Sequence, residues 1–124
     1  MKTDRPVNLN LFTISLPLVG IVSFIHRVTG MALFVGVAFG LYALDLALSS
    51  AAGFDQAAAL MQEPLAKFIF LALIFVLVFH IAAGVKHLFM DFHIGDSLEA
   101  ARINAWVVII VTVVVTAGLG ASLW

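Results

Sequence analysis

The chain has 124 residues, of which 64% are hydrophobic and 10% are charged, and it contains no cysteine. Its mean hydropathy of +1.19 is too high for a soluble domain of this length and indicates a membrane protein. The net charge of −1 gives no reason to expect a nucleic-acid partner, and the lack of cysteine excludes disulfides and thiolate-bound metal centres such as iron–sulfur clusters.

The N-terminal sequence MKTDRPVNLN is polar and includes an acid and a proline. A secretory signal peptide would instead place an apolar run close behind its basic residues. We therefore expect the mature chain to begin near Met1, with a short cytoplasmic N-terminal segment before the first apolar stretch.

Three segments are long and apolar enough to cross a bilayer, which takes about 20 residues of helix. They are residues 21–48, 65–90 and 105–124. The last has no charge and is rich in β-branched residues, but an isolated strand in lipid would leave its backbone groups unpaired, so a helix is expected there too. The sequence therefore predicts an all-α membrane protein with three transmembrane helices.

The two connections between these segments differ in sequence. Residues 49–64 contain Gly53, which we expect to break the helix, then a short helical pattern and Pro64, which can begin the next helix at its first turn. Residues 91–104 form a polar connection. We expect residues 1–124 to form a single membrane-anchor domain.

Most lysine and arginine residues gather on one side of the predicted bundle, and Lys67, just inside the second span, is the exception. Lys2 and Arg5 precede the first span, and Lys86 and Arg102 flank the second connection, whereas residues 49–64 contain neither residue type. Cytoplasmic flanks of membrane spans accumulate these residues. The N-terminus and the second connection are therefore predicted to be cytoplasmic, and the C-terminus periplasmic.

The depth of the ionisable residues follows from the helical rise. At 1.5 Å per residue, Arg27 lies roughly 33 Å from Ser49 and His87 roughly 35 Å from Pro64, which places both at the cytoplasmic edge. His80 lies about 10 Å deeper, inside the apolar region.

The second span carries a stripe of chemically distinctive residues on one face, namely His80, Gly84, His87 and Asp91. A glycine one turn from a deep histidine leaves room for a flat ligand, and imidazole can bind haem iron. Alternatively, His80 hydrogen-bonds a neighbouring helix and Gly84 permits close packing. The other histidines are estimated to lie too near the membrane edge to oppose His80, so a second haem ligand would come from another subunit.

The first span groups Ser23, His26, Arg27 and Gly30 on one side at spacings of three and four. A hydroxyl and a guanidinium one turn apart can hydrogen-bond a carbonyl oxygen or an anion, and a histidine beside them can donate to a carboxylate. The alternative is interfacial anchoring, in which Arg27 reaches lipid phosphate. The common depth of this cluster and His87 favours a ligand site.

Three motifs in this order resemble one known family. RPVNLNL at residues 5–11, SFIHRVTG at 23–30 and HIAAGVKHLFMD at 80–91 together resemble the cytochrome b subunit of bacterial succinate dehydrogenase, respiratory complex II. The resemblance extends over nearly the whole chain with matching spacing. Thr29 stands where relatives often have serine, which keeps the hydroxyl.

The resemblance implies the larger of two small anchors that hold a flavoprotein and an iron–sulfur subunit on the cytoplasmic face of the bacterial inner membrane. It implies one haem b between the anchors, with His80 as the axial ligand from this chain and the other ligand from the small anchor. By position, Ser23 and Arg27 match ubiquinone-site residues, and His26, Arg27 and His87 match groups near the haem propionates.

No succinate-binding or flavin motif is present, so the chain is expected to be part of an oxidoreductase without holding its dicarboxylate site. Two other interpretations remain open. An anchor of a fumarate reductase would share the architecture and run in the opposite direction. A small non-redox transport or assembly subunit would use Arg27 and His80 as a proton path and would purify colourless.

Overall fold

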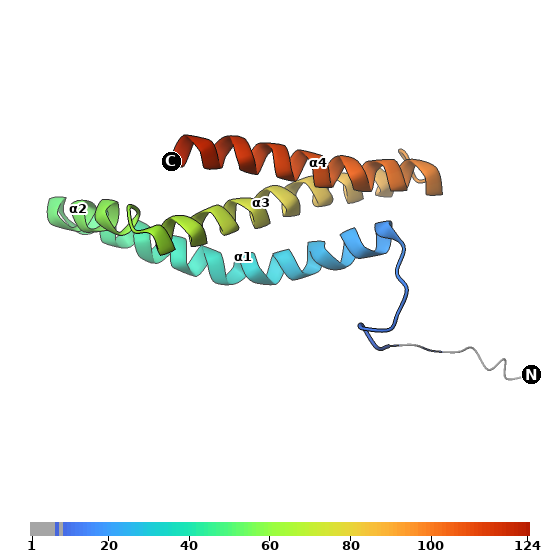
Figure 1. Cartoon of the computed structure of the whole chain (residues 1–124), viewed down its shortest axis with the longest axis horizontal. Coiled ribbons are helices and arrows are strands. Elements are labelled where there is room, and N and C mark those ends of the chain that lie inside the picture. Colours follow the sequence, from blue (N-terminus) through green and yellow to red (C-terminus); the bar gives the residue numbers. More distant parts are fainter. Residues whose placement is uncertain (1–6, 8) are drawn as a thin grey trace, which may run out of the picture.

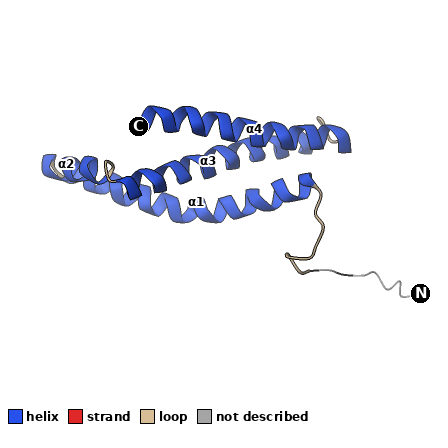
Figure 2. Ribbon diagram, in the orientation of Figure 1, coloured by secondary structure: helices blue, strands red, loops and turns tan. Residues whose placement is uncertain are grey.

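The computed structural model describes residue 7 and residues 9–124. This part of the chain contains helices and no strand (Figure 2). The helices, in chain order, are α1 (Leu18–Ser49), α2 (Ala51–Leu60), α3 (Pro64–Asp91) and α4 (Leu98–Leu123). Helices α1, α3 and α4 are each long and apolar enough to cross a membrane. The prediction of an all-α protein with three membrane-spanning helices is confirmed.

The long helices lie side by side with alternating direction, α3 between α1 and α4, and the short α2 folds back beside the end of α1 (Figure 1). The α3–α4 connection lies near the start of α1, at one end of the bundle. The C-terminus and α2 lie towards the other end. Lys2 and Arg5 of the expected N-terminal segment lie outside the described residues.

The helix ends follow local sequence signals. Ser50 caps α2 by accepting a hydrogen bond from the backbone N–H of Gly53, at 2.9 Å. Pro64 opens α3 at its first turn, as predicted. Ser97 caps α4 through the N–H of Ala100, at 3.2 Å. The acidic Glu99 in the first turn of α4 also stabilises the helix, because its negative charge lies at the positive end of the helix dipole.

Two predictions about the connections are wrong. Gly53 does not break a helix: it lies inside α2, and a side chain there would collide with the end of α1. The break falls at Ser50, whose backbone is extended. Helix α4 begins at Leu98, well before the predicted residue 105, because the Ser97 cap supports a polar first stretch that hydropathy alone assigns to a loop.

A small core forms where α1, α3 and α4 meet. Its buried residues are Val22, Phe79, Ala83, Ala105 and Val108. Ala83 and Ala105 have no exposed surface, and such small side chains allow helices to approach closely. Large apolar side chains such as Phe34 point outwards instead. Most of the bundle surface is therefore suited to lipid or to other membrane subunits.

The orientation of the bundle remains a prediction from its lysines and arginines. A periplasm-active reporter enzyme fused after Gly53 or after Trp124 should be active, because both positions lie towards the end opposite the α3–α4 connection. The same reporter fused after Asp96, in that connection, should be inactive. The reverse pattern of activities would place the N-terminus outside and overturn the assignment.

Candidate functional site

Helices α1 and α3 bring three histidine side chains into one cluster. The rings of His26 and His80 are stacked, with centroids 4.2 Å apart and an interplanar angle of 18°. The ring of His87 is tilted by 52° against that of His26, with centroids 5.3 Å apart. His93 lies outside the cluster, in the α3–α4 connection, where its exposed Nδ1 contacts Asp96 at 3.2 Å.

His80 is held by two oxygen atoms of α1. Its Nδ1 lies 3.0 Å from the backbone carbonyl oxygen of His26 and 3.0 Å from Oγ1 of Thr29. The Thr29 hydroxyl donates to the same carbonyl oxygen at 2.8 Å. Because a carbonyl oxygen only accepts, the hydrogen-bond network places the His80 proton on Nδ1. The lone pair of Nε2 is then available, as in a neutral imidazole that binds a metal.

Two glycines make room for this arrangement of rings. A Cβ atom added at Gly30 would lie 3.1 Å from Cε1 of His80, and one added at Gly84 would lie 3.4 Å from Nε2 of His26. The sequence left two interpretations of Gly84 open, space for a flat ligand beside His80 or close packing of helices. In the structure the neighbour of Gly84 is the His26 ring, so this glycine serves the contact between α1 and α3.

The stacking also corrects the estimated depth of His26. Counting along the helix placed it near the membrane edge, above His80, but the two rings lie side by side. The count ignores helix tilt and the reach of the side chain. Rings in stacked contact leave no space for a macrocycle between them, so His26 is not positioned as a ligand opposite His80.

Ser23 and Arg27 lie on α1, one turn apart, beside the cluster. Ser23 is half-buried and Arg27 is exposed. Within the described part of the chain, neither side chain makes a hydrogen bond or an ion pair. Their donors are thus free for a ligand or for another subunit.

Thr29 belongs to the cluster, and its contact with His80 was not predicted from the sequence. It is 5% exposed and connects the backbone of α1 to the ring of His80. A possible signal was a hydroxyl residue three positions after a histidine in an apolar segment, since a buried hydroxyl requires a partner.

The cluster is unlike a site for a free metal ion. Among the described residues, no group of three or more His, Cys, Asp or Glu side chains converges on a common point. The histidine rings stack on one another instead. A single available nitrogen on His80 is the arrangement expected of an axial ligand to a metal that a macrocycle already holds.

Comparison with known proteins identifies the family. Residues 1–119 match the model of the succinate dehydrogenase/fumarate reductase transmembrane subunit. The chain belongs to this family. The resemblance drawn from the three sequence motifs is confirmed, and the protein is a multi-pass membrane subunit of the complex II type.

Relatives from bacteria and mitochondria agree with this assignment. The chain is 33% identical to the succinate dehydrogenase cytochrome b556 subunit of Coxiella burnetii, with both chains fully covered. It is 32% identical to the cytochrome b556 subunit of Paracoccus denitrificans, over 82% of this chain and 78% of that protein. It is 33% identical to the mitochondrial cytochrome b560 subunit of Bos taurus, over 95% of this chain and 71% of that protein.

The role of Thr29 can be tested in the purified protein by removing its hydroxyl and keeping its shape. Thr29→Val should lower the free energy of unfolding by about 0.6 to 1 kcal/mol, the scale of an interhelical hydrogen bond in a membrane protein. Thr29→Ser, which keeps the hydroxyl, should stay closer to wild type. Thermal unfolding in detergent measures both. A Val variant as stable as wild type would show that the hydroxyl contacts contribute nothing.

Proposed function

We propose that the chain is the membrane-anchor subunit of a succinate:quinone oxidoreductase, where it binds haem b and ubiquinone and passes electrons from an iron–sulfur subunit to the quinone. The observation that carries the proposal is the hydrogen-bond network of His80, which fixes the ring through Nδ1 and leaves Nε2 available. The relatives' names, cytochrome b556 and b560, point to the same kind of cofactor.

The residues on α1 and α3 fit a haem. His80 would bind the iron through Nε2, and the carbonyl of His26 would keep the imidazole oriented and basic. His26, Arg27 and His87 would lie near the propionates, where their N–H groups can donate to carboxylates. When bound, the haem supplies one-electron redox chemistry.

The second axial ligand would come from the small anchor subunit. The stacked geometry excludes His26 as that ligand, and His93 is in the α3–α4 connection, paired with Asp96. A haem shared between two anchors would also cover part of the exposed apolar surface of this bundle. A flavoprotein and an iron–sulfur subunit would then bind at the cytoplasmic face of the bacterial inner membrane and supply electrons.

Ser23 and Arg27 are the residues of this chain suited to a quinone. Reduction of a quinone builds negative charge on its oxygen atoms, and a guanidinium stabilises that charge where water is scarce. The Ser23 hydroxyl can both donate and accept a hydrogen bond, so it can orient a carbonyl oxygen and assist the arrival of a proton. Because neither side chain is engaged within the described residues, both are ready to bind.

A fumarate reductase anchor is the second candidate, because the matching family model covers both enzymes. The two differ in the physiological direction of electron flow. The relatives named above are all succinate dehydrogenase subunits, which favours succinate oxidation. Comparison of ubiquinone and low-potential quinones as substrates, in both directions, separates the two.

The haem assignment is tested by replacing His80. His80→Leu in the assembled complex should alter or abolish the six-coordinate low-spin spectrum in reduced-minus-oxidised difference spectroscopy, because the iron loses its ligand from this chain. His93→Leu is the matched control and should leave the spectrum unchanged. An unaltered spectrum in the His80 variant would refute the assignment, whereas retained haem alone would not, since the partner ligand and the propionates can still hold it.

The quinone assignment is tested with Arg27→Leu and Ser23→Ala. Loss of a charged hydrogen bond to a quinone oxygen costs on the order of 1.5 to 3 kcal/mol, so Arg27→Leu should slow ubiquinone reduction roughly ten- to a hundredfold. Ser23→Ala should have a smaller effect.

The measurement compares two electron acceptors in the same preparation, together with haem content. Succinate oxidation by an artificial acceptor that takes electrons upstream of the quinone should survive in Arg27→Leu. A parallel loss of both activities would make Arg27 an assembly residue. Unchanged ubiquinone reduction would place the quinone site elsewhere.

A further inference from the structure

The ammonium group of Lys86, on α3, is buried and has no hydrogen-bond partner among the described residues. The residue is 4% exposed, and its Nζ makes no hydrogen bond within the described part of the chain. An ammonium away from water costs several kcal/mol unless an opposite charge or several acceptors surround it. In the sequence, Lys86 contributes only to the predicted orientation of the bundle. Its burial leaves the ammonium in need of a counter-charge that the described residues do not supply.

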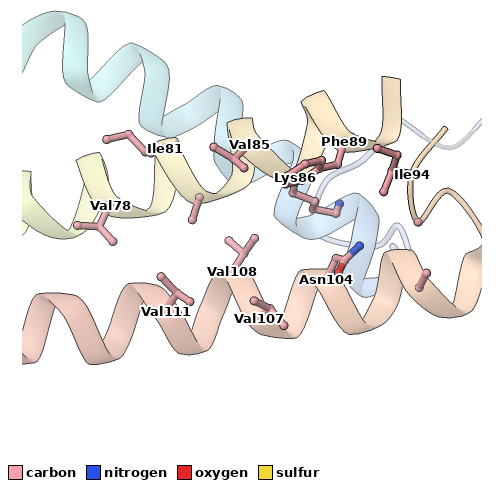
Figure 3. A pocket seen from close by; sticks show the side chains of 13 residues that line it. Val78, Ile81, Val85, Lys86, Phe89, Ile94, Asn104, Val107, Val108 and Val111 are labelled. Atoms are coloured by element: carbon pink, nitrogen blue, oxygen red, sulfur yellow. The ribbon is translucent and has the colours of Figure 1, made fainter. Parts of the chain in front are cut away.

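Lys86 lines a cavity of about 740 Å³ between α3 and α4. Figure 3 shows the Lys86 ammonium and the Asn104 amide at the same end of this space, close to the α3–α4 connection. The walls that lead away from them are apolar and include Val78, Val107 and Val111. From Lys86 to Val78 the cavity follows α3 for about 12 Å along the helix axis. It is thus polar at one end and apolar along its length.

The cavity is separate from the histidine cluster. None of the residues that line it belongs to the cluster. Lys86 follows His80 by six positions, which is about 240° around the helix, so the two side chains leave α3 in different directions. His80 contacts α1, whereas the cavity lies between α3 and α4.

The layout of the cavity matches an amphiphile with an anionic head. Its polar end lies near the end of α3 and hence near the membrane surface, and its apolar walls lead towards the middle of the span. Basic pockets of this kind between membrane helices suit phospholipid head groups. A volume of about 740 Å³ is typical of a small-molecule site. Helices α3 and α4 already pack against each other through Ala83 and Ala105. The space that remains between them is therefore a narrow slot, which suits an acyl chain better than another helix.

We propose that this cavity binds a membrane phospholipid, whose phosphate contacts Lys86 and Asn104 and whose acyl chain lies along Val107 and Val111. The phosphate supplies the charge that Lys86 lacks within the chain. The acyl chain fills the apolar part of the cavity. The site is independent of haem and quinone, and its test does not use either.

The test measures phospholipid bound to the intact complex. The complex is equilibrated in phosphatidylcholine nanodiscs that contain phosphatidylglycerol, extracted in mild detergent and weighed by native mass spectrometry. Wild type should retain phosphatidylglycerol, and Lys86→Met should retain at least about tenfold less, the loss expected for one charged hydrogen bond. Lys67→Met is the matched control. It lies on the same helix, with its Nζ 5.6 Å from the centroid of the Trp124 ring, and it does not line the cavity.

A second pair of variants tests the apolar part with Lys86 intact. Val107→Trp should fill the cavity and displace the lipid, whereas Val114→Trp, on an exposed position outside the cavity, should not. Thermal unfolding provides a separate measure: added phosphatidylglycerol should raise the melting temperature of wild type more than that of Lys86→Met.

Several outcomes would overturn the proposal. Wild type without retained phospholipid would do so, as would equal retention in wild type and Lys86→Met. If Lys86→Met keeps its phospholipid and loses another subunit on extraction, the partner of Lys86 is a protein carboxylate and the lipid site is wrong.

Discussion

A polar side chain in the hydrocarbon of a membrane must find its hydrogen-bond partner in the protein, and His80 finds one on a neighbouring helix. Its Nδ1 contacts the backbone carbonyl of His26, which fixes α1 and α3 against each other at that level. The stacked His26 ring and the close approaches at Gly30 and Gly84 accompany the same contact. The cluster therefore depends on the backbone of α1 as much as on the histidine side chains.

Helix α3 carries two polar side chains, of which one has hydrogen-bond partners among the described residues and the other has none. His80 is satisfied through Nδ1 by oxygen atoms of α1 and keeps one nitrogen for a ligand. Lys86 is enclosed between helices without a hydrogen bond in the described chain. Because the two side chains leave the helix in different directions, one helix would serve the two proposed sites separately. The proposed haem site would still need a second ligand from another subunit, and Lys86 would need a counter-charge.

The sequence predicted the spans because hydropathy and helical length are local properties. Helical spacing predicted that His26 and His87 lie at one level with His80 about 10 Å deeper, and only the family resemblance placed all three near one haem. The sequence-based prediction missed the start of α4 at Leu98, where a cap outweighs polarity, and it misjudged His26, whose ring reaches the level of His80. Which side chains meet depends on how the helices cross, and one sequence carries little information about that. For the same reason, the contact between Thr29 and His80 could not be predicted from the sequence.

The energies of these contacts indicate that the bundle gains more from its surroundings than from its internal hydrogen bonds. A hydrogen bond between membrane helices contributes only about 0.6 kcal/mol on average, whereas an unpaired polar group in hydrocarbon costs several times as much. The contact of Thr29 and His80 thus does more to set the orientation and tautomer of the ring than to stabilise the bundle. Most of the available free energy lies in the groups that the described residues leave without partners, namely Lys86 and the exposed apolar surface. A bundle of this composition gains most from what surrounds it, so its stability should rise on assembly with lipid and with other subunits.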